Sequence, residues 1–157
     1  MSPELASILK GTGLLSDQEL DLGTVDSGSY ALNRILSGKY DGGYPIGGIT
    51  EIIGESSVGK TGFLTHLFRN AQKEGYICAL ADNEFAYSPK FAEQLGIDAT
   101  QLVYFDPEEI DTAPKCFKKM ETFIKDVRKV DKDTPIIIAL DSMGTLQSDA
   151  EYGQELS

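Results

Sequence analysis

One octapeptide of the sequence carries glycine, lysine and threonine at a spacing that could hold a phosphate group. Residues 54–61 are GESSVGKT and match the pattern GxxxxGK[ST] at every specified position. Glycines let the backbone curl so that successive amide N–H groups point inward at phosphate oxygens. Lys60 adds a positive charge beside the outer phosphates, and the Thr61 hydroxyl can coordinate Mg²⁺. A coincidental glycine-rich turn is disfavoured, because an apolar segment precedes the octapeptide and an amphipathic one follows it.

This segment is expected to bind a nucleotide mainly through its backbone. The helix predicted to follow would point the positive end of its dipole at the same anion. The candidate nucleotide-binding residues of the segment are Gly54, Glu55, Ser56, Ser57, Val58, Gly59, Lys60, Thr61 and Gly62.

Carboxylates follow two apolar segments further along the chain. Asp141 ends the run Ile136–Leu140, which is typical of a strand buried on both faces, and ligands bind at the carboxyl ends of such strands. Asp141 could hold Mg²⁺ beside the phosphates; capping a turn is the alternative role. Asp82 and Glu84 lie two apart and are expected to project to the same side. On spacing alone, Glu84 fits a group that polarises the attacking water and a solvated strand end equally well.

Two further sets of polar residues have ordinary structural interpretations. His66 lies about one and a half turns into the helix after the octapeptide, too far along to touch phosphate, and is expected to be partly exposed. A group of basic residues is interleaved with acidic ones, so a solvated helix face is favoured over a nucleic-acid patch. These basic residues are Lys115, Lys118, Lys119, Lys125, Arg128, Lys129 and Lys132.

The elements that must position these residues alternate between strands and helices. After a short helix at residues 2–10 and a linker at residues 11–28, the pattern predicts helices at Ser29–Leu36, Gly59–Glu74, Pro89–Leu95 and Thr112–Val130, and strands at Ile49–Ile53, Tyr76–Ala81, Gln101–Phe105 and Ile136–Leu140. This alternation favours an α/β fold with a mainly parallel sheet and helices on both faces.

Length and charge narrow the class of protein. The chain has 157 residues, 41% of them hydrophobic, which suits one domain. Its 14 basic and 25 acidic side chains give a net charge of −11, and no broad basic face for nucleic acid is visible.

No apolar run approaches the ~20 residues that span a bilayer, and the N-terminus lacks a secretory layout, so we expect an intracellular protein with no membrane partner. Cys78, Cys116 and His66 cannot supply a zinc quartet, and both thiols are expected to be reduced and packed.

Several segments in the right order resemble the RecA class of recombinases, and more closely the UvsX-type recombinases of bacteriophages. These segments are residues 26–32, 42–52 (GGYPIGGITEI), 54–61 (GESSVGKT), 81–98 (ADNEFAYSPKFAEQLGID) and 136–146 (IIIALDSMGTL). The resemblance covers about residues 25–150. It implies a P-loop NTPase with a RecA-like core at residues 29–157, preceded by an N-terminal helix and linker at residues 1–28 that could serve oligomerisation.

The resemblance also implies a role for each matching site residue. Lys60 would serve the phosphates in catalysis, and Thr61 would bind the metal. Asp141 would be the Walker B acid and second metal ligand, with Ser142 beside it in the nucleotide site. Glu84 matches the family's catalytic glutamate.

Two positions concern the adenine base. Phe91 falls where an aromatic residue packs on adenine, although Tyr is more familiar there in bacterial members. Ser88 stands where those members carry an acidic contact to the base, so adenine selectivity is left open.

The implied function is that of an ATP-dependent DNA recombinase, a DNA-dependent ATPase that uses ATP and Mg²⁺. Such proteins associate with themselves in filaments or rings on single-stranded DNA, in the cytoplasm, or in the host cytoplasm if a phage encodes them.

This sequence stops at Ser157, before the family's DNA-binding loops. We therefore expect an N-terminal portion of a longer recombinase, a split gene product or a degenerate copy, with weak or absent DNA binding and with the strand at Ile49–Ile53 at an open sheet edge. A non-catalytic nucleotide-binding module that joins intact subunits, or another RecA-like ATPase, is the alternative.

Overall fold

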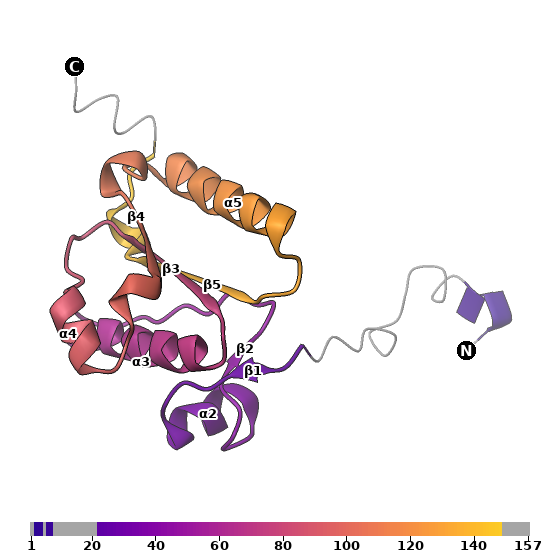
Figure 1. Ribbon diagram of the computed structural model, residues 1–157. Coiled ribbons are helices and arrows are strands. Elements are labelled where there is room, and N and C mark those ends of the chain that lie inside the picture. Colours follow the sequence, from indigo (N-terminus) through magenta and orange to yellow (C-terminus); the bar gives the residue numbers. More distant parts are fainter. Residues whose placement is uncertain (1, 5, 8–21, 149–157) are drawn as a thin grey trace.

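The computed structural model describes residues 2–4, 6, 7 and 22–148 (Figure 1). Residues 3, 4, 6 and 7 are helical, and the N–H of Ala6 donates to the carbonyl of Ser2 at 3.0 Å. The rest of the helix predicted at residues 2–10, and the linker up to residue 21, lie outside the described residues. None of the helices in the described ranges is both long and apolar enough to cross a membrane.

A parallel sheet of three strands forms the centre of the described residues. Its order is β4 (Leu102–Phe105), β3 (Ile77–Asp82) and β5 (Ile136–Asp141), and Ala79 of β3 pairs with Val103 on one side and Ile138 on the other. Residues 78–82 of β3 are all buried because β3 has a neighbour on both sides and helices on both faces. The three strands that were predicted at these positions are thereby confirmed.

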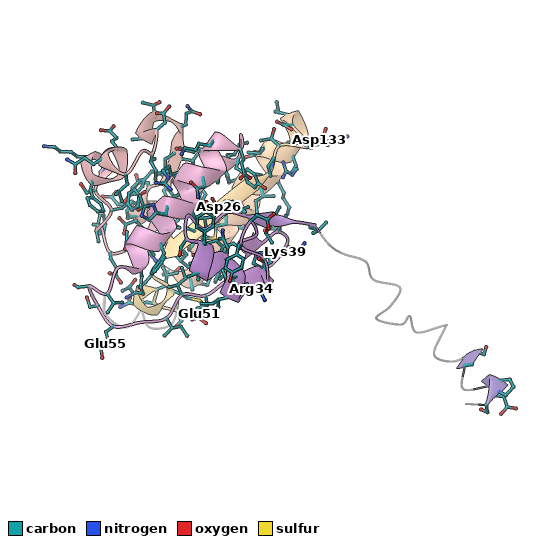
Figure 2. All side chains as sticks on the ribbon, turned by 90° about the horizontal axis from the view of Figure 1, so that it is seen from below. Asp26, Arg34, Lys39, Glu51, Glu55 and Asp133 are labelled. Carbon is teal, nitrogen blue, oxygen red and sulfur yellow. The ribbon has the colours of Figure 1, made fainter. Side chains whose placement is uncertain are left out.

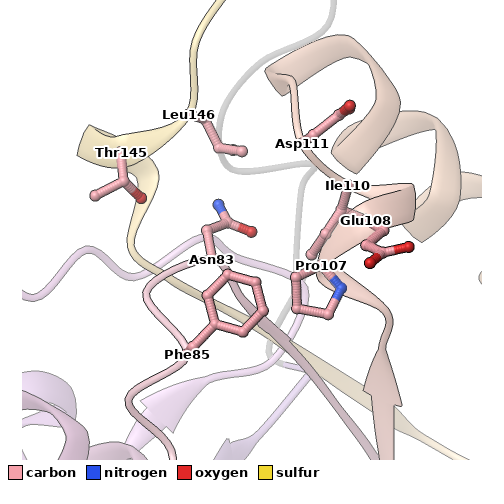
Figure 3. Close-up of a pocket in the computed structure, with 8 residues that line it drawn as sticks. All are labelled: Asn83, Phe85, Pro107, Glu108, Ile110, Asp111, Thr145 and Leu146. Atoms are coloured by element: carbon pink, nitrogen blue, oxygen red, sulfur yellow. The ribbon is translucent and has the colours of Figure 1, made fainter.

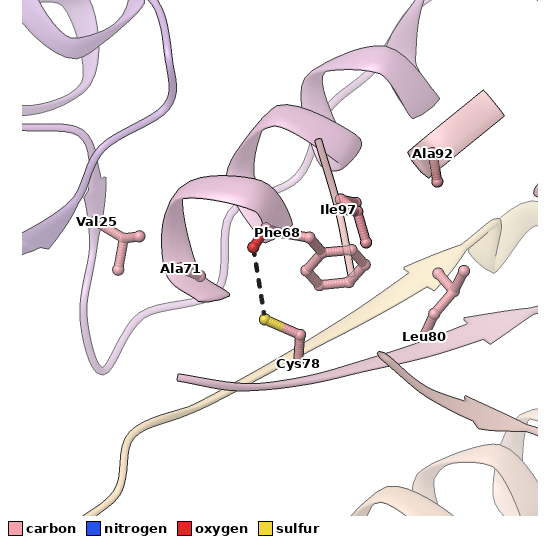
Figure 4. Packing of buried hydrophobic residues seen from close by; sticks show 7 residues of the cluster. All are labelled: Val25, Phe68, Ala71, Cys78, Leu80, Ala92 and Ile97. Atoms are coloured by element: carbon pink, nitrogen blue, oxygen red, sulfur yellow. Dashed lines mark hydrogen bonds between the residues drawn. The ribbon is translucent and has the colours of Figure 1, made fainter. Parts of the chain in front are cut away.

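Helices cover both faces of this sheet, as the alternation of elements predicted. The helices α3 (Lys60–Lys73) and α4 (Pro89–Gln94) lie on one face, and α5 (Ala113–Val130) lies on the other (Figure 1). The first face buries a cluster of Val25, Phe68, Ala71, Cys78, Leu80, Ala92 and Ile97 (Figure 4). The second face buries Ala79, Ala81, Phe105, Ile110 and Cys116. Short 3₁₀ turns, η2 (Ala99–Gln101), η3 (Pro107–Glu109) and η4 (Met143–Thr145), complete the connections.

A smaller unit precedes α3 and is joined to it by a polar network. Here β1 (Thr24–Val25) pairs antiparallel with β2 (Tyr44–Pro45), and α2 (Tyr30–Ser37) begins after Ser29, whose side chain caps it. The Asp26 carboxylate accepts from Asn33 Nδ2 at 2.8 Å and from Asn70 Nδ2 of α3 at 3.1 Å. Because Asn33 is buried, the network fixes this unit against the helix that follows the octapeptide. The proposed division of the chain at residue 28 stays a prediction.

The prediction of a strand at Ile49–Ile53 is wrong. These residues have no strand structure and pair with none of the described strands, and Ile49 and Ile53 are 101% and 84% exposed. An apolar pattern indicates side chains that are stabilised by burial. A strand forms only where a neighbouring strand completes the backbone hydrogen bonds and other elements of the fold cover the apolar side chains. The outer edge of β5 is open among the described strands, and residues 49–53 do not pair with it.

The strand predicted at Ile136–Leu140 packs on both faces, as expected, but none of its residues is fully buried. All residues of β5 are half-buried. Ile137 and Ala139 pack against the first core cluster, while Ile138 and Leu140 pack against the second. The remaining exposure arises because β5 is an edge strand of the described sheet.

The lysines of α5 lie on the solvated face that the sequence predicted, whereas Arg128 is half-buried and donates to the carbonyls of Asp131 and Thr134. Lys115 pairs with Asp111 at 2.8 Å and Lys129 with Asp126 at 2.7 Å. The remaining ion pairs join Lys118 to Glu121 at 3.4 Å, Lys119 to Glu109, and Lys125 to Glu121. Because each of these lysines lies beside a carboxylate, the exposed surface of α5 has no continuous basic patch.

The turn from α5 to β5 carries a pH-dependent contribution to stability. Hydrogen bonds from the Thr134 hydroxyl and from the N–H groups of Thr134 and Asp133 lower the pKa of Asp131 from 3.8 to about 2. Because the folded-state pKa is depressed, this stabilisation is present above pH 4 and is lost as the pH falls from about 4 to about 2. Asp131→Asn is therefore expected to lower the urea midpoint at pH 7, and the gap to the wild type should close toward pH 2.

The control is Asp133→Asn. Asp133 lies in the same turn, and its exposed carboxylate accepts no hydrogen bond from any described residue. It is expected to leave the midpoint close to the wild type throughout. A gap between Asp131→Asn and the wild type that stays constant from pH 7 to pH 2 would contradict the assignment.

Candidate functional site

The candidate phosphate loop, residues 54–59, leads directly into the first turn of α3. All its residues are exposed, and Ser57 and Gly59 adopt positive φ values of 64° and 100°. Glycine at position 59 accommodates that conformation without a Cβ penalty. No side chain caps α3, and its first turn contains no acidic residue. The positive end of the helix dipole therefore faces the loop without a competing carboxylate.

The ammonium group of Lys60 folds back over this loop. Its Nζ donates to the carbonyl of Gly54 at 3.0 Å and to that of Glu55 at 2.9 Å. The Glu55 side chain points outward from the body of the protein (Figure 2). Neutral carbonyls are weaker partners for an ammonium group than phosphate oxygens, so an incoming phosphate could replace them.

Thr61 and Asp141 meet although 80 positions separate them. The Thr61 hydroxyl donates to Asp141 Oδ2 at 2.9 Å, which brings the start of α3 beside the end of β5. One hydroxyl and one carboxylate are hard oxygen donors, and Mg²⁺ is usually held by one or two carboxylates together with substrate phosphates and water. This donor set fits Mg²⁺ bound with a nucleotide. The described residues contain no cluster of three or more His, Cys, Asp or Glu side chains that could hold a metal alone.

Glu84 lies at the same carboxyl end of the sheet, on the loop after β3. Ser142 Oγ donates to Glu84 Oε1 at 2.6 Å, and the Glu84 side chain is exposed. The N–H of Asn83 donates to the carbonyl of Asp141 at 2.9 Å, so the ends of β3 and β5 are tied together. Two hydrogen bonds, Thr61 to Asp141 and Ser142 to Glu84, therefore bring three separate segments of the chain together, since Asp141 and Ser142 are consecutive.

The prediction that Asp82 and Glu84 project to the same side is wrong. β3 ends at Asp82, and the chain then turns, so the two-residue periodicity of a strand does not extend to Glu84. Asp82 is 1% exposed, and its carboxylate accepts N–H groups of the loop, whereas Glu84 faces solvent. The role of Asp82 within the loop was missed because it depends on where the strand stops.

The two residues considered for adenine lie around the start of α4. Ser88 caps this helix and accepts from the N–H of Phe91 at 3.3 Å. The Phe91 ring is 52% exposed, and its contact with a base stays a prediction. His66 on α3 is half-buried, close to the partial exposure expected, and its Nδ1 has no described hydrogen-bond partner.

Neither cysteine is suited to nucleophilic chemistry. Burial raises the pKa of the Cys78 thiol to about 12 and also raises the pKa of Cys116. Both cysteines are buried and neither forms a disulfide, so each thiol remains protonated and behaves as a small apolar group at neutral pH.

A cavity of 510 Å³ lies on the side of the Glu84 loop that faces η3 and η4 (Figure 3). Its lining includes none of residues 54–62, so it is separate from the candidate phosphate loop. The lining residues are Asn83, Phe85, Pro107, Glu108, Ile110, Asp111, Thr145 and Leu146.

Comparison with known proteins identifies relatives over most of the chain. Residues 6–157 match the family described as the RecA N-terminal domain. Protein RecA of Chlorobaculum parvum is 37% identical over 132 residues, which are 84% of this chain and 35% of that relative. Protein RecA of Brucella canis is 34% identical over 141 residues, 90% of this chain and 36% of that relative. The chain thus spans about a third of the length of the curated relatives it matches.

Proposed function

This chain belongs to the RecA N-terminal domain family, and from that premise we propose that it binds ATP with Mg²⁺ and hydrolyses it as the nucleotide-binding part of a DNA recombinase. The observation that carries the proposal is the set of contacts among Thr61, Asp141, Ser142 and Glu84 beside the Lys60 loop. A hydroxyl and a carboxylate that would hold Mg²⁺, together with a second carboxylate that would orient water, are groups that support phosphoryl transfer to water next to a phosphate loop.

Each residue has one part in the proposed reaction. The backbone N–H groups of residues 54–59 and the first turn of α3 bind the phosphates, and Lys60 exchanges its two carbonyl partners for phosphate oxygens. Glu84 orients a water molecule and accepts its proton as the water attacks the γ-phosphate. Phe91 packs on the adenine.

Thr61 and Asp141 would hold Mg²⁺, which supplies neutralising charge to the phosphate oxygens when it is bound. Their present hydrogen bond of 2.9 Å keeps both oxygens on the same side of the site. This arrangement needs no large movement of α3 relative to β5, because both oxygens are already adjacent.

The wider biology is part of the proposal. In the complete protein we expect ATP-dependent assembly into a filament or ring on single-stranded DNA, in the cytoplasm, with homologous recombination and repair as the outcome. The subtype we propose is a UvsX-type phage recombinase, on the resemblance of the segments at residues 26–32, 42–52, 54–61, 81–98 and 136–146 taken together. The net charge of −11 and the ion-paired lysines of α5 support weak DNA binding by these residues alone.

A second candidate function is a nucleotide-binding module without turnover, which attaches to intact recombinase subunits. One observation favours it: Ile49 and Ile53 are 101% and 84% exposed, and exposed apolar side chains of this kind mark a surface that a partner protein can cover. The two candidates differ in hydrolysis rather than in ATP binding.

Calorimetric titration with Mg·ATP and the variant Lys60→Ala test the shared claim. The substitution is expected to weaken ATP binding by about tenfold to a hundredfold, since a hydrogen bond to a charged group contributes about 1.5–3 kcal/mol. Lys73→Ala, which removes an exposed lysine from the last turn of the same helix, is the matched control and should bind within about twofold of the wild type.

Equal binding by the wild type and Lys60→Ala would overturn the proposed phosphate site. Phosphate release with and without single-stranded DNA then separates the two candidates. Hydrolysis supports the enzyme, whereas tight binding of Mg·ATP with no turnover supports the module.

A further inference from the structure

Glu84 lies on a loop that has no regular structure of its own. Residues 83–88 connect β3 to α4 without helix or strand, and both Glu84 and Phe85 are exposed, Phe85 by 73%. Phe85 has a φ of 55°, a left-handed conformation that a non-glycine residue adopts only when its surroundings hold it. Something other than backbone preference must therefore fix the loop in this shape.

The buried carboxylate of Asp82 is the first of two fixing points. It accepts the N–H groups of Glu84 at 3.1 Å, Ala86 at 3.3 Å and Tyr87 at 2.9 Å. Tyr104 of β4 adds its hydroxyl at 3.4 Å. A carboxylate that is 1% exposed needs such donors to compensate for lost hydration, so the loop wraps around Asp82.

The hydroxyl of Ser142 is the second fixing point, and it acts on the Glu84 side chain itself. Ser142 Oγ lies 2.6 Å from Glu84 Oε1, while the Ser142 carbonyl accepts from Asn83 Nδ2 at 3.4 Å and from Thr145 Oγ1 at 2.9 Å. A hydroxyl has one proton to donate, so it holds one carboxylate oxygen. None of the described residues donates to Glu84 Oε2, which leaves that oxygen to meet water.

We propose that Ser142 and Asp82 are positioning residues for Glu84: Asp82 shapes the loop that carries it, and Ser142 holds its carboxylate beside Asp141. This inference rests on the proposed function, in which Glu84 orients the attacking water. Both residues act through Glu84, since Ser142 touches Oε1 and Asp82 binds only loop amides and the Tyr104 hydroxyl.

The kinetic test compares Ser142→Ala with Ser142→Thr. The alanine variant is expected to lower kcat for ATP hydrolysis by about tenfold with KM within about twofold, because a misplaced catalytic group slows the chemical step more than binding. The threonine variant keeps the hydroxyl and should recover kcat to within about threefold of the wild type. Thr122→Ala is the control, since it removes a hydroxyl that donates to the Lys118 carbonyl on α5, on the other face of the sheet.

A second measurement does not depend on catalysis. Amide hydrogen exchange is followed at Glu84, Ala86 and Tyr87, with Leu95 after α4 as the internal reference. Asp82→Asn is expected to speed exchange at the three loop amides by about tenfold or more, and Ser142→Ala to speed it at Glu84, with Leu95 unchanged in both.

The outcomes distinguish this inference from the proposed function. If the wild type binds Mg·ATP without hydrolysing it, the enzymatic proposal fails, and exchange in Ser142→Ala and Asp82→Asn still decides whether the two residues hold the loop. A Ser142→Ala variant with wild-type kcat, or with wild-type exchange at Glu84, overturns the inference. Should Asp82→Asn fail to fold, the serine variants carry the test alone.

Discussion

Replacing Glu84 by glutamine is expected to lower the rate of ATP hydrolysis by about 100-fold or more while Mg·ATP binding stays within about twofold of the wild type. Glutamine keeps the size of the side chain and can still accept from Ser142, but its amide cannot take a proton from water. The loss therefore falls on the chemical step, and single-turnover hydrolysis combined with calorimetric binding measures the two quantities separately.

The matched control for this prediction is Glu93→Gln, an exposed glutamate on α4 that follows the same loop. It removes one negative charge from the same region and should change neither rate nor affinity by more than about twofold. If Glu84→Gln hydrolysed ATP as fast as the wild type, the role of Glu84 as the proton acceptor would be refuted, whatever the affinity for ATP.

Truncating Phe68 to alanine is expected to cost about 3–5 kcal/mol in the free energy of unfolding. Phe68 is 0% exposed, and its ring lies between α3 and the sheet, against Ile97, Cys78 and Leu80 (Figure 4). Removing it opens a cavity under the helix that begins with Lys60 and Thr61. Because a domain is stable by only about 5–15 kcal/mol, the variant should lose most of its stability.

Urea denaturation followed by circular dichroism checks this loss. The matched control is Phe63→Ala on the same helix, because Phe63 is 43% exposed and should cost about 1.5 kcal/mol or less. Equal losses for the two variants would mean that the core does not lie where α3 meets β3. A variant Phe68→Ala that stays folded is also expected to bind Mg·ATP more weakly, since α3 positions the first turn beside the loop.

The sequence determined the elements whose signals are local. Ser29 and Ser88 mark the starts of α2 and α4 because their side chains cap free N–H groups within the next turn. The apolar runs at β3 and β5 and the amphipathic pattern of α5 predicted the sheet and its helices to within a residue or two at each end. The octapeptide at residues 54–61 was equally visible, since its chemistry follows from adjacent residue types. The roles of its residues stay predictions.

Only the tertiary structure decided which of these elements find partners and where the acids of the site point. Ile49–Ile53 has the composition of a strand but no ladder in the described residues, because pairing depends on a neighbour distant in sequence. Asp82 turns inward and Glu84 outward because β3 ends between them. The contacts from Ser142 to Glu84 and from Thr61 to Asp141 span 58 and 80 positions, and such contacts follow from chain topology and packing rather than from local sequence.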